Sequence, residues 1–127
     1  MQNSNLLTSF QRAFAGIWYV VRTQRNMRIH LSVTGAIVVL GLWVGLSRTE
    51  WAILTLTIGM VLVAEAFNTM AEAIVDLATA EYHPLAKIAK DVAAGAVLLT
   101  AITAVVVGLF ILGPPLWQSM LDILNMR

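Results

Sequence analysis

The chain has 127 residues, of which 59% are hydrophobic and 12% are charged, and its formal net charge is +1. Soluble domains usually have about 25% charged and about 45–50% apolar residues, so this composition argues against an ordinary soluble protein and indicates one embedded in lipid. The absence of cysteine excludes disulfides and thiolate metal sites, and the absence of a Lys/Arg run argues against nucleic-acid binding.

The first predicted element is an amphipathic helix over residues 6–23. Its apolar residues recur at intervals of three and four, and so form one stripe, made of Leu7, Phe10, Phe14, Ile17, Trp18 and Val21. Arg12 and Arg22 fall outside this stripe. The pattern predicts a helix that lies in the membrane surface. An ordinary helix packed against the rest of the protein is the open alternative.

Three apolar segments follow, and they predict membrane-spanning helices over about residues 30–48, 51–77 and 85–112. A helix needs about 20 mostly apolar residues to cross a bilayer, and backbone groups that face lipid have to be satisfied within the segment itself. The whole chain, residues 1–127, is therefore expected to be a single all-α integral-membrane domain, with three transmembrane helices and an N-terminal surface helix.

The boundaries of these spans come from short polar or helix-breaking stretches. Residues 47–50, Ser-Arg-Thr-Glu, predict a tight link between the first two spans. Pro84 is well placed as the first residue of the third spanning helix, because a first-turn proline loses no helical hydrogen bond. The stretch Gly113-Pro114-Pro115 predicts the end of that helix.

The placement of Lys and Arg predicts the topology. Six lie in the N-terminal region or between the second and third spans, namely Arg12, Arg22, Arg25, Arg28, Lys87 and Lys90. Two lie in the first link and the tail, namely Arg48 and Arg127. This asymmetry places the N-terminus and the second link in the cytoplasm, where ATP and Mg²⁺ are available.

Polar residues continue the second span in the stretch AEAFNTMAEAIVD, residues 64–76. Glu65, Asn68, Glu72 and Asp76 fall within roughly an 80° arc of a helix. A charge at the centre of a bilayer costs about 2.5–3.5 kcal/mol or more, so acids at membrane depth are usually functional. Three uses remain open: Mg²⁺ binding by hard oxygens, general-base catalysis, and a proton or ion relay. Ion pairing with neighbouring helices is the structural alternative.

A second polar cluster, EYHPLAKIAKD, covers residues 81–91. Lys87 and Asp91 are four residues apart and so can pair on one helix face. Lys90 lies just before the third apolar run, where a cation could hold phosphate oxygens or simply extend to the membrane interface. His83 could cap a helix or contact a ligand. The sequence has no glycine-rich phosphate-binding loop, so a bound nucleotide would be held by side chains and metal.

The stretches AEAFNTMAEAIVD and EYHPLAKIAKDVAAGAVLL together resemble the signature of the prokaryotic diacylglycerol kinase and undecaprenol kinase family of small integral-membrane lipid kinases. The resemblance implies transfer of the ATP γ-phosphoryl group to a lipid alcohol, with Mg²⁺, in a homotrimer. Residues 83–97, HPLAKIAKDVAAGAV, are more similar to the undecaprenol kinase branch than to the diacylglycerol kinase branch.

The resemblance also implies roles by position. Glu65 would be the general base, Asn68 would position groups around it, Asp76 would support the site and Glu72 would bind metal. The nucleotide would be contacted by Glu81, His83, Lys90 and Asp91. Arg12 is a further candidate for the nucleotide.

One position departs from the family pattern. Members commonly have a second metal-binding Glu before the first span, whereas TQRNMRIH has Gln24 there. An amide is a weaker Mg²⁺ ligand than a carboxylate, so we expect activity to be retained with weaker metal binding. Two other functions stay open at this point: a small ion- or proton-translocating membrane subunit that uses the same acids, and a catalytically weakened relative of the kinases.

Overall fold

The computed structural model describes residues 5–125, and this part of the chain is helical with short connections. Its helices are α1 (Leu6–Thr23), α2 (Arg25–Val44), α3 (Arg48–Ala78) and α4 (Pro84–Asn125). The prediction of an all-α protein is therefore confirmed. Arg127, which entered the topology argument, lies outside the described residues.

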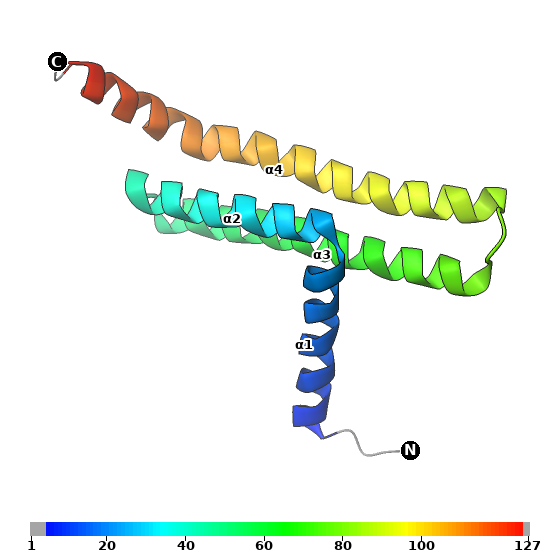
Figure 1. The fold of residues 1–127 in the computed structure, drawn as a ribbon. Helices are drawn as coiled ribbons and strands as arrows, with labels where there is room; N and C mark the ends of the chain where they lie inside the picture. The colour runs from blue at the N-terminus through cyan, green and yellow to red at the C-terminus, as the bar shows by residue number, and fades with distance from the viewer. Residues whose placement is uncertain (1–4, 126–127) are drawn as a thin grey trace.

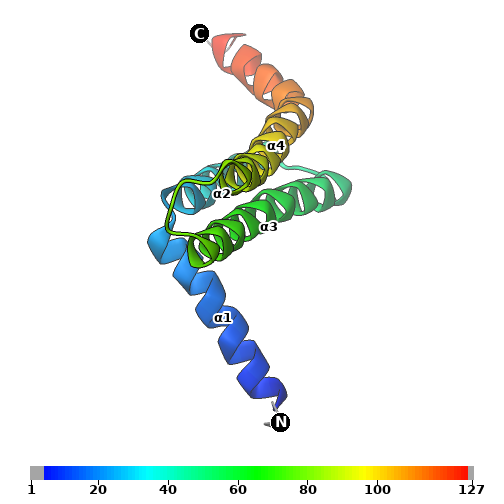
Figure 2. The same cartoon turned by 90° about the vertical axis from the view of Figure 1, so that its right-hand side faces the viewer.

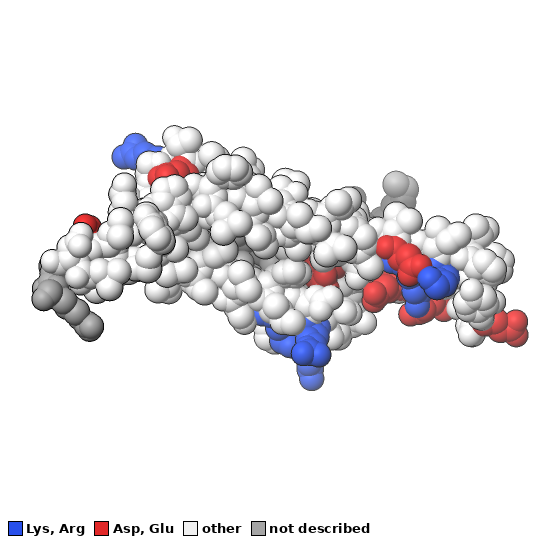
Figure 3. All heavy atoms as spheres, turned by 90° about the horizontal axis from the view of Figure 1, so that it is seen from above, with Lys and Arg blue, Asp and Glu red and all other residues white. Residues whose placement is uncertain are grey.

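Three of these helices, α2, α3 and α4, are long and apolar enough to cross a membrane. The protein is accordingly a membrane protein with three candidate spans, as predicted. Helix α3 packs mainly on α4, and α2 contacts both. Figure 3 shows charged side chains gathered toward the end where α3 and α4 are connected, a basic cluster at the middle of one edge and a smaller charged group near the other end, with wide uncharged surface between them. The uncharged surface is suited to contact with lipid.

Helix α1 leaves this bundle at a steep angle (Figures 1 and 2). Gln24, between α1 and α2, has an extended backbone with φ −95° and ψ 120°, which makes the corner. Arg28 holds the corner by donating from Nη1 to the backbone oxygen of Arg22 at 3.0 Å, which satisfies a free carbonyl at the end of α1. The apolar stripe of α1 is exposed, with Phe14 at 67%. Its position in the membrane surface stays a prediction.

The connection between α2 and α3 differs from the predicted link over residues 47–50, which was wrong in its position. Helix α3 already begins at Arg48, because Ser47 and Glu50 form a capping box. Ser47 Oγ accepts from the Glu50 backbone N–H at 3.3 Å, and Glu50 Oε2 accepts from the Ser47 N–H at 2.7 Å. The actual link is residues 45–47, and it starts with Gly45 in the left-handed region at φ 73°.

The prediction that Gly113-Pro114-Pro115 ends the third spanning helix was also wrong, because α4 continues through both prolines to Asn125. Each proline removes one helical N–H donor, but its fixed φ is compatible with a helix. Ending the helix in lipid would leave more backbone groups unsatisfied than two prolines do. Figure 2 shows α4 bending in its C-terminal part. By contrast, Pro84 is the first residue of α4, as predicted.

Candidate active site

Glu65 is the most deeply buried acid of the polar face of α3. Its side chain is 1% exposed, and neither carboxylate oxygen has a hydrogen-bond partner among the described residues. Asn68, one turn further along, is 6% exposed and its Oδ1 is likewise unpaired. Buried polar atoms are nearly always paired in folded proteins, so these three unpaired oxygens point to a ligand that they would bind.

Glu65 and Asn68 line a pocket of about 280 Å³ between three helices. Its lining comes from α2 with Asn26, Ile29 and His30, from α3 with Glu65 and Asn68, and from α4 with Ala94, Val97, Leu98 and Ala101. Glu65 therefore faces the interior of the bundle and not the lipid. The pocket lies close to the place where α1 leaves the bundle, because Asn26 is near the start of α2. The α3–α4 connection lies farther along the bundle than this place (Figure 1).

Glu72 is joined to Asn68, whose Nδ2 donates to Glu72 Oε1 at 3.2 Å. This bond fixes the orientation of the Asn68 amide and leaves its Oδ1 unpaired, one helical turn from the Glu72 carboxylate. Hard oxygen donors of this kind suit Mg²⁺, which usually takes one or two carboxylates together with waters and substrate phosphates. The donors thus fit a shared metal–phosphate site. No group of three His, Asp or Glu residues within 5–125 forms a complete protein cage for a metal.

Asp76 and Lys90 form an ion pair that connects α3 to α4, with Lys90 Nζ 2.6 Å from Asp76 Oδ1. Their side chains are 67% and 40% exposed, and exposed pairs contribute little to stability. Lys87 and Asp91 pair along α4, four residues apart, as the spacing predicted. Both lysines are therefore close to the surface and can exchange a carboxylate for a phosphate at little cost.

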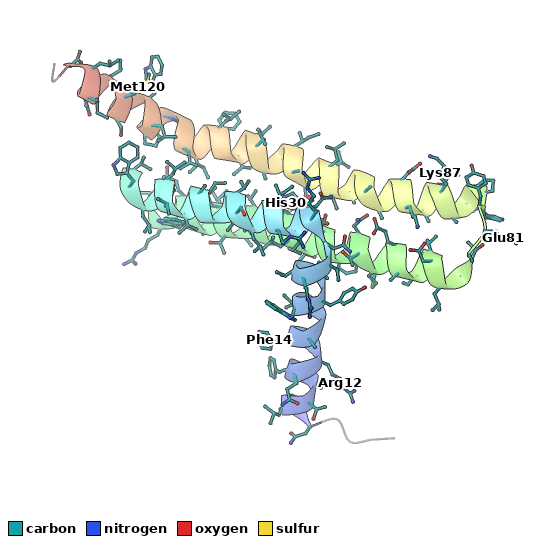
Figure 4. All side chains as sticks on the ribbon, viewed as in Figure 1. Arg12, Phe14, His30, Glu81, Lys87 and Met120 are labelled. Carbon is teal, nitrogen blue, oxygen red and sulfur yellow. The ribbon has the colours of Figure 1, made fainter. Side chains whose placement is uncertain are left out.

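The α3–α4 connection contains the other residues expected near a nucleotide. His83 Nδ1 accepts from the Leu85 backbone N–H at 3.2 Å, so in this structure the imidazole caps the start of α4. Glu81 is exposed at the turn, where Figure 4 labels it, and its backbone N–H donates to Thr79 Oγ1 at 3.2 Å. Both side chains lie on the same end of the bundle as Lys90.

Two expected contributors lie apart from the buried acids within one chain. Gln24 is at the α1–α2 corner, where its Nε2 donates to Thr23 Oγ1 at 3.4 Å, and it does not line the pocket beside Glu65. Arg12 lies toward the free end of α1 (Figure 4). The structure thus brings together Glu65, Asn68 and Glu72, and it leaves Gln24 and Arg12 apart from them. Asp76 lies further along α3, where it pairs with Lys90 near the start of α4.

Sequence reasoning missed Asn26 and His30, which line the pocket opposite Glu65. A signal was present in TQRNMRIH, since residues 26 and 30 are four apart and share one face of α2. Nothing in the sequence says that this face is turned toward Glu65, because that depends on how α2 packs against α3 and α4.

Residues 11–112 match the family described as prokaryotic diacylglycerol kinase. A diacylglycerol kinase from Synechocystis sp. is 49% identical over 117 residues, which are 91% of this chain and 67% of that protein. An undecaprenol kinase from Bacillus subtilis is 45% identical over 108 residues, covering 85% and 88%. A diacylglycerol kinase from Escherichia coli is 35% identical over 69 residues, covering 54% and 57%.

Proposed function

Because the chain belongs to the prokaryotic diacylglycerol kinase family and is a membrane lipid kinase, we propose that it transfers the γ-phosphoryl group of ATP to the hydroxyl of a lipid alcohol at the cytoplasmic membrane surface. Membership of the family confirms the expectation of an enzyme and decides against the ion-translocating alternative. The donor, the metal and the residue roles are part of the proposal.

The observation that carries the proposal is the unpaired, buried carboxylate of Glu65 beside Asn68. Glu65 accepts the proton of the lipid hydroxyl as the hydroxyl oxygen forms its bond to the γ-phosphorus. The bond from the γ-phosphorus to the β–γ bridging oxygen breaks, and ADP leaves. Asn68, fixed by its bond to Glu72, orients the reacting groups.

The nucleotide lies along the exposed ends of α3 and α4. Lys90 leaves Asp76 and holds phosphate oxygens, while Glu81, His83 and Asp91 contact the remainder of the nucleotide. Glu72 would hold Mg²⁺, with the free oxygen of Asn68 one turn away, and Gln24, which lies apart from them within one chain, would have to contribute its amide oxygen from a second copy. The bound metal supplies neutralisation of the phosphate charge, which phosphoryl transfer requires along with positioning.

We propose that three copies assemble, with the N-terminus in the cytoplasm of a bacterial inner membrane. No Lys or Arg among the described residues lines the pocket beside Glu65, and in such an assembly Arg12 or Arg25 of a second copy would add positive charge to that of Lys90 at the phosphates. With three spans, the C-terminus then lies on the opposite side of the membrane. The excess of Lys and Arg near α1 and the α3–α4 connection supports this orientation.

We propose undecaprenol as the preferred acceptor. Residues 83–97 are more similar to that branch of the family, and the Bacillus subtilis relative that covers most of the chain is named undecaprenol kinase. Diacylglycerol is the second candidate, since the Synechocystis relative is named for it.

The experiment that tests the base role compares Glu65→Gln with the native chain in detergent micelles that contain a lipid alcohol and ATP labelled on its γ-phosphate. The amide has the same shape but cannot take the proton, so transfer should fall by at least about 10²-fold. Asp122→Asn is the matched control, because it makes the same change at the far end of α4 and should leave transfer unchanged. Native turnover in Glu65→Gln, with the control equally active, would remove Glu65 from this role.

A further inference from the structure

Two cavities meet at His30, which is partly buried near the start of α2 (Figure 4). The polar pocket beside Glu65 is one of them. The other is a cavity of about 530 Å³ between α2, α3 and α4. Both have Ile29, His30 and Ala101 in their linings, so they adjoin at these three residues. A ligand that occupies both would pass beside the imidazole of His30.

The larger cavity is built for hydrocarbon. Its volume falls within the range of about 300–1,000 Å³ that ligand pockets have. Along α4 its lining extends from Ala101 to Leu116, which corresponds to about 22 Å of helix. Apart from His30, the polar side chain in this lining is Thr34, whose hydroxyl donates to the His30 backbone oxygen at 2.8 Å and is therefore turned toward its own helix. The length and the apolar lining suit one extended hydrocarbon chain.

The polar end of this ligand can be deduced from the groups that meet at the junction. A lipid alcohol that lies in the larger cavity has its hydroxyl where the two cavities adjoin. That hydroxyl has one proton to donate, which goes to the unpaired carboxylate of Glu65, and lone pairs that accept. A neutral imidazole has one N–H donor, and within residues 5–125 the ring of His30 makes no hydrogen bond, since the contact from Thr34 goes to its backbone oxygen. The ring is free to donate to the acceptor oxygen.

We propose that the larger cavity holds the part of the acceptor's hydrocarbon chain nearest its hydroxyl and that His30 donates a hydrogen bond to the acceptor hydroxyl, holding its oxygen in the direction of Glu65. This acceptor site rests on the proposed function. It adds His30 as a positioning residue and a binding site for the hydrocarbon chain of the lipid. It commits the acceptor to an alcohol with at least one long chain that runs along the bundle axis. His30 thereby determines how tightly the alcohol binds and leaves the nucleotide site unaffected.

The first test measures transfer rates of the purified full-length chain in micelles while the mole fraction of lipid alcohol and the ATP concentration are varied separately. His30→Leu removes the donor and should raise the half-saturating mole fraction of lipid by about tenfold, with half-saturating ATP unchanged. His30→Gln keeps an N–H donor and should restore most of the affinity for lipid. An equal rise for lipid and ATP, or no rise for lipid, would overturn the proposal.

The second test fills the cavity. A side chain at Gly108 would project into open space, because nothing lies within 4 Å of a Cβ there, and Gly108 lines the cavity about 10 Å along α4 from Ala101. Gly108→Leu should weaken binding of long-chain alcohols and spare those whose chains end before Gly108. Gly59→Leu is the matched control, since Gly59 also has open space around it but lines neither cavity.

The outcomes separate this inference from the function on which it rests. If the native chain phosphorylates no lipid alcohol, the proposed function fails and the acceptor site fails with it. If the native protein is active and Gly108→Leu affects short and long alcohols equally, the cavity does not hold the hydrocarbon chain of the lipid. In that case the acceptor site alone is wrong. The same holds if Gly108→Leu disrupts assembly and leaves lipid affinity unchanged, because a second copy would then occupy the cavity.

Discussion

Replacing Glu65 by methionine should stabilise the protein while it abolishes kinase activity. The carboxyl group is 1% exposed, and neither of its oxygens is hydrogen-bonded among the described residues. An unpaired buried polar group costs about 1–3 kcal/mol, and methionine has a similar length with no polar oxygen. The variant should therefore gain about 1–3 kcal/mol in free energy of unfolding, which is the stability that the active site gives up for its function.

The measurement is denaturant unfolding of the purified chain in mild micelles, without nucleotide and without lipid acceptor, so that no ligand contributes to stability. Asp122→Asn is the control at an exposed position and should stay within about 0.5 kcal/mol of the native chain. Destabilisation of Glu65→Met by 1 kcal/mol or more would refute the reasoning, because it would mean that the carboxylate is bonded in the folded protein.

Three further predictions concern packing, nucleotide and metal. Gly41→Ala should lose about 1–3 kcal/mol in the same unfolding assay, because its methyl group would lie 2.9 Å from the side chains of Leu46 in the α2–α3 connection and Trp51 in α3. Gly35→Ala on the same helix has open space and should not be destabilised, and equal effects of the two variants would contradict this packing. Lys90→Ala should change the free energy of unfolding by less than about 0.5 kcal/mol, since the pair of Lys90 with Asp76 is exposed. The same variant should raise the half-saturating ATP concentration severalfold, and an unchanged ATP dependence would remove Lys90 from the nucleotide site. Gln24→Glu should lower half-saturating Mg²⁺, and an unchanged value would show that this side chain does not bind the metal.

The parts of the fold that sequence predicted well are those determined by local chemistry. Periodic apolar residues predicted the helix over residues 6–23, which the structure has as Leu6–Thr23. Pro84 opens α4, as its missing N–H led us to expect. The start of α3 could also have been predicted, because Ser47 and Glu50 have capping-box spacing. The continuation of α4 through Pro114 could not, since it reflects what an apolar helix gains from staying intact in lipid.

In the candidate site too, the sequence predicted what depends on local spacing and did not predict what depends on contacts between distant helices. Spacing alone placed Glu65, Asn68 and Glu72 on one helix face, and the structure brings these three together. The burial of Glu65 and its position opposite His30 depend on contacts between helices that are far apart in sequence. Local patterns say which residues share a face, but they do not say what that face meets.

The most direct measurement offers undecaprenol and diacylglycerol side by side to the purified chain in micelles, with Mg²⁺ and ATP labelled on its γ-phosphate. The proposed function predicts that label enters the lipid phase as a lipid phosphate, and that undecaprenol receives more of it than diacylglycerol. Label that stays on the nucleotide or appears only as inorganic phosphate would contradict the claim that this membrane protein phosphorylates a lipid alcohol.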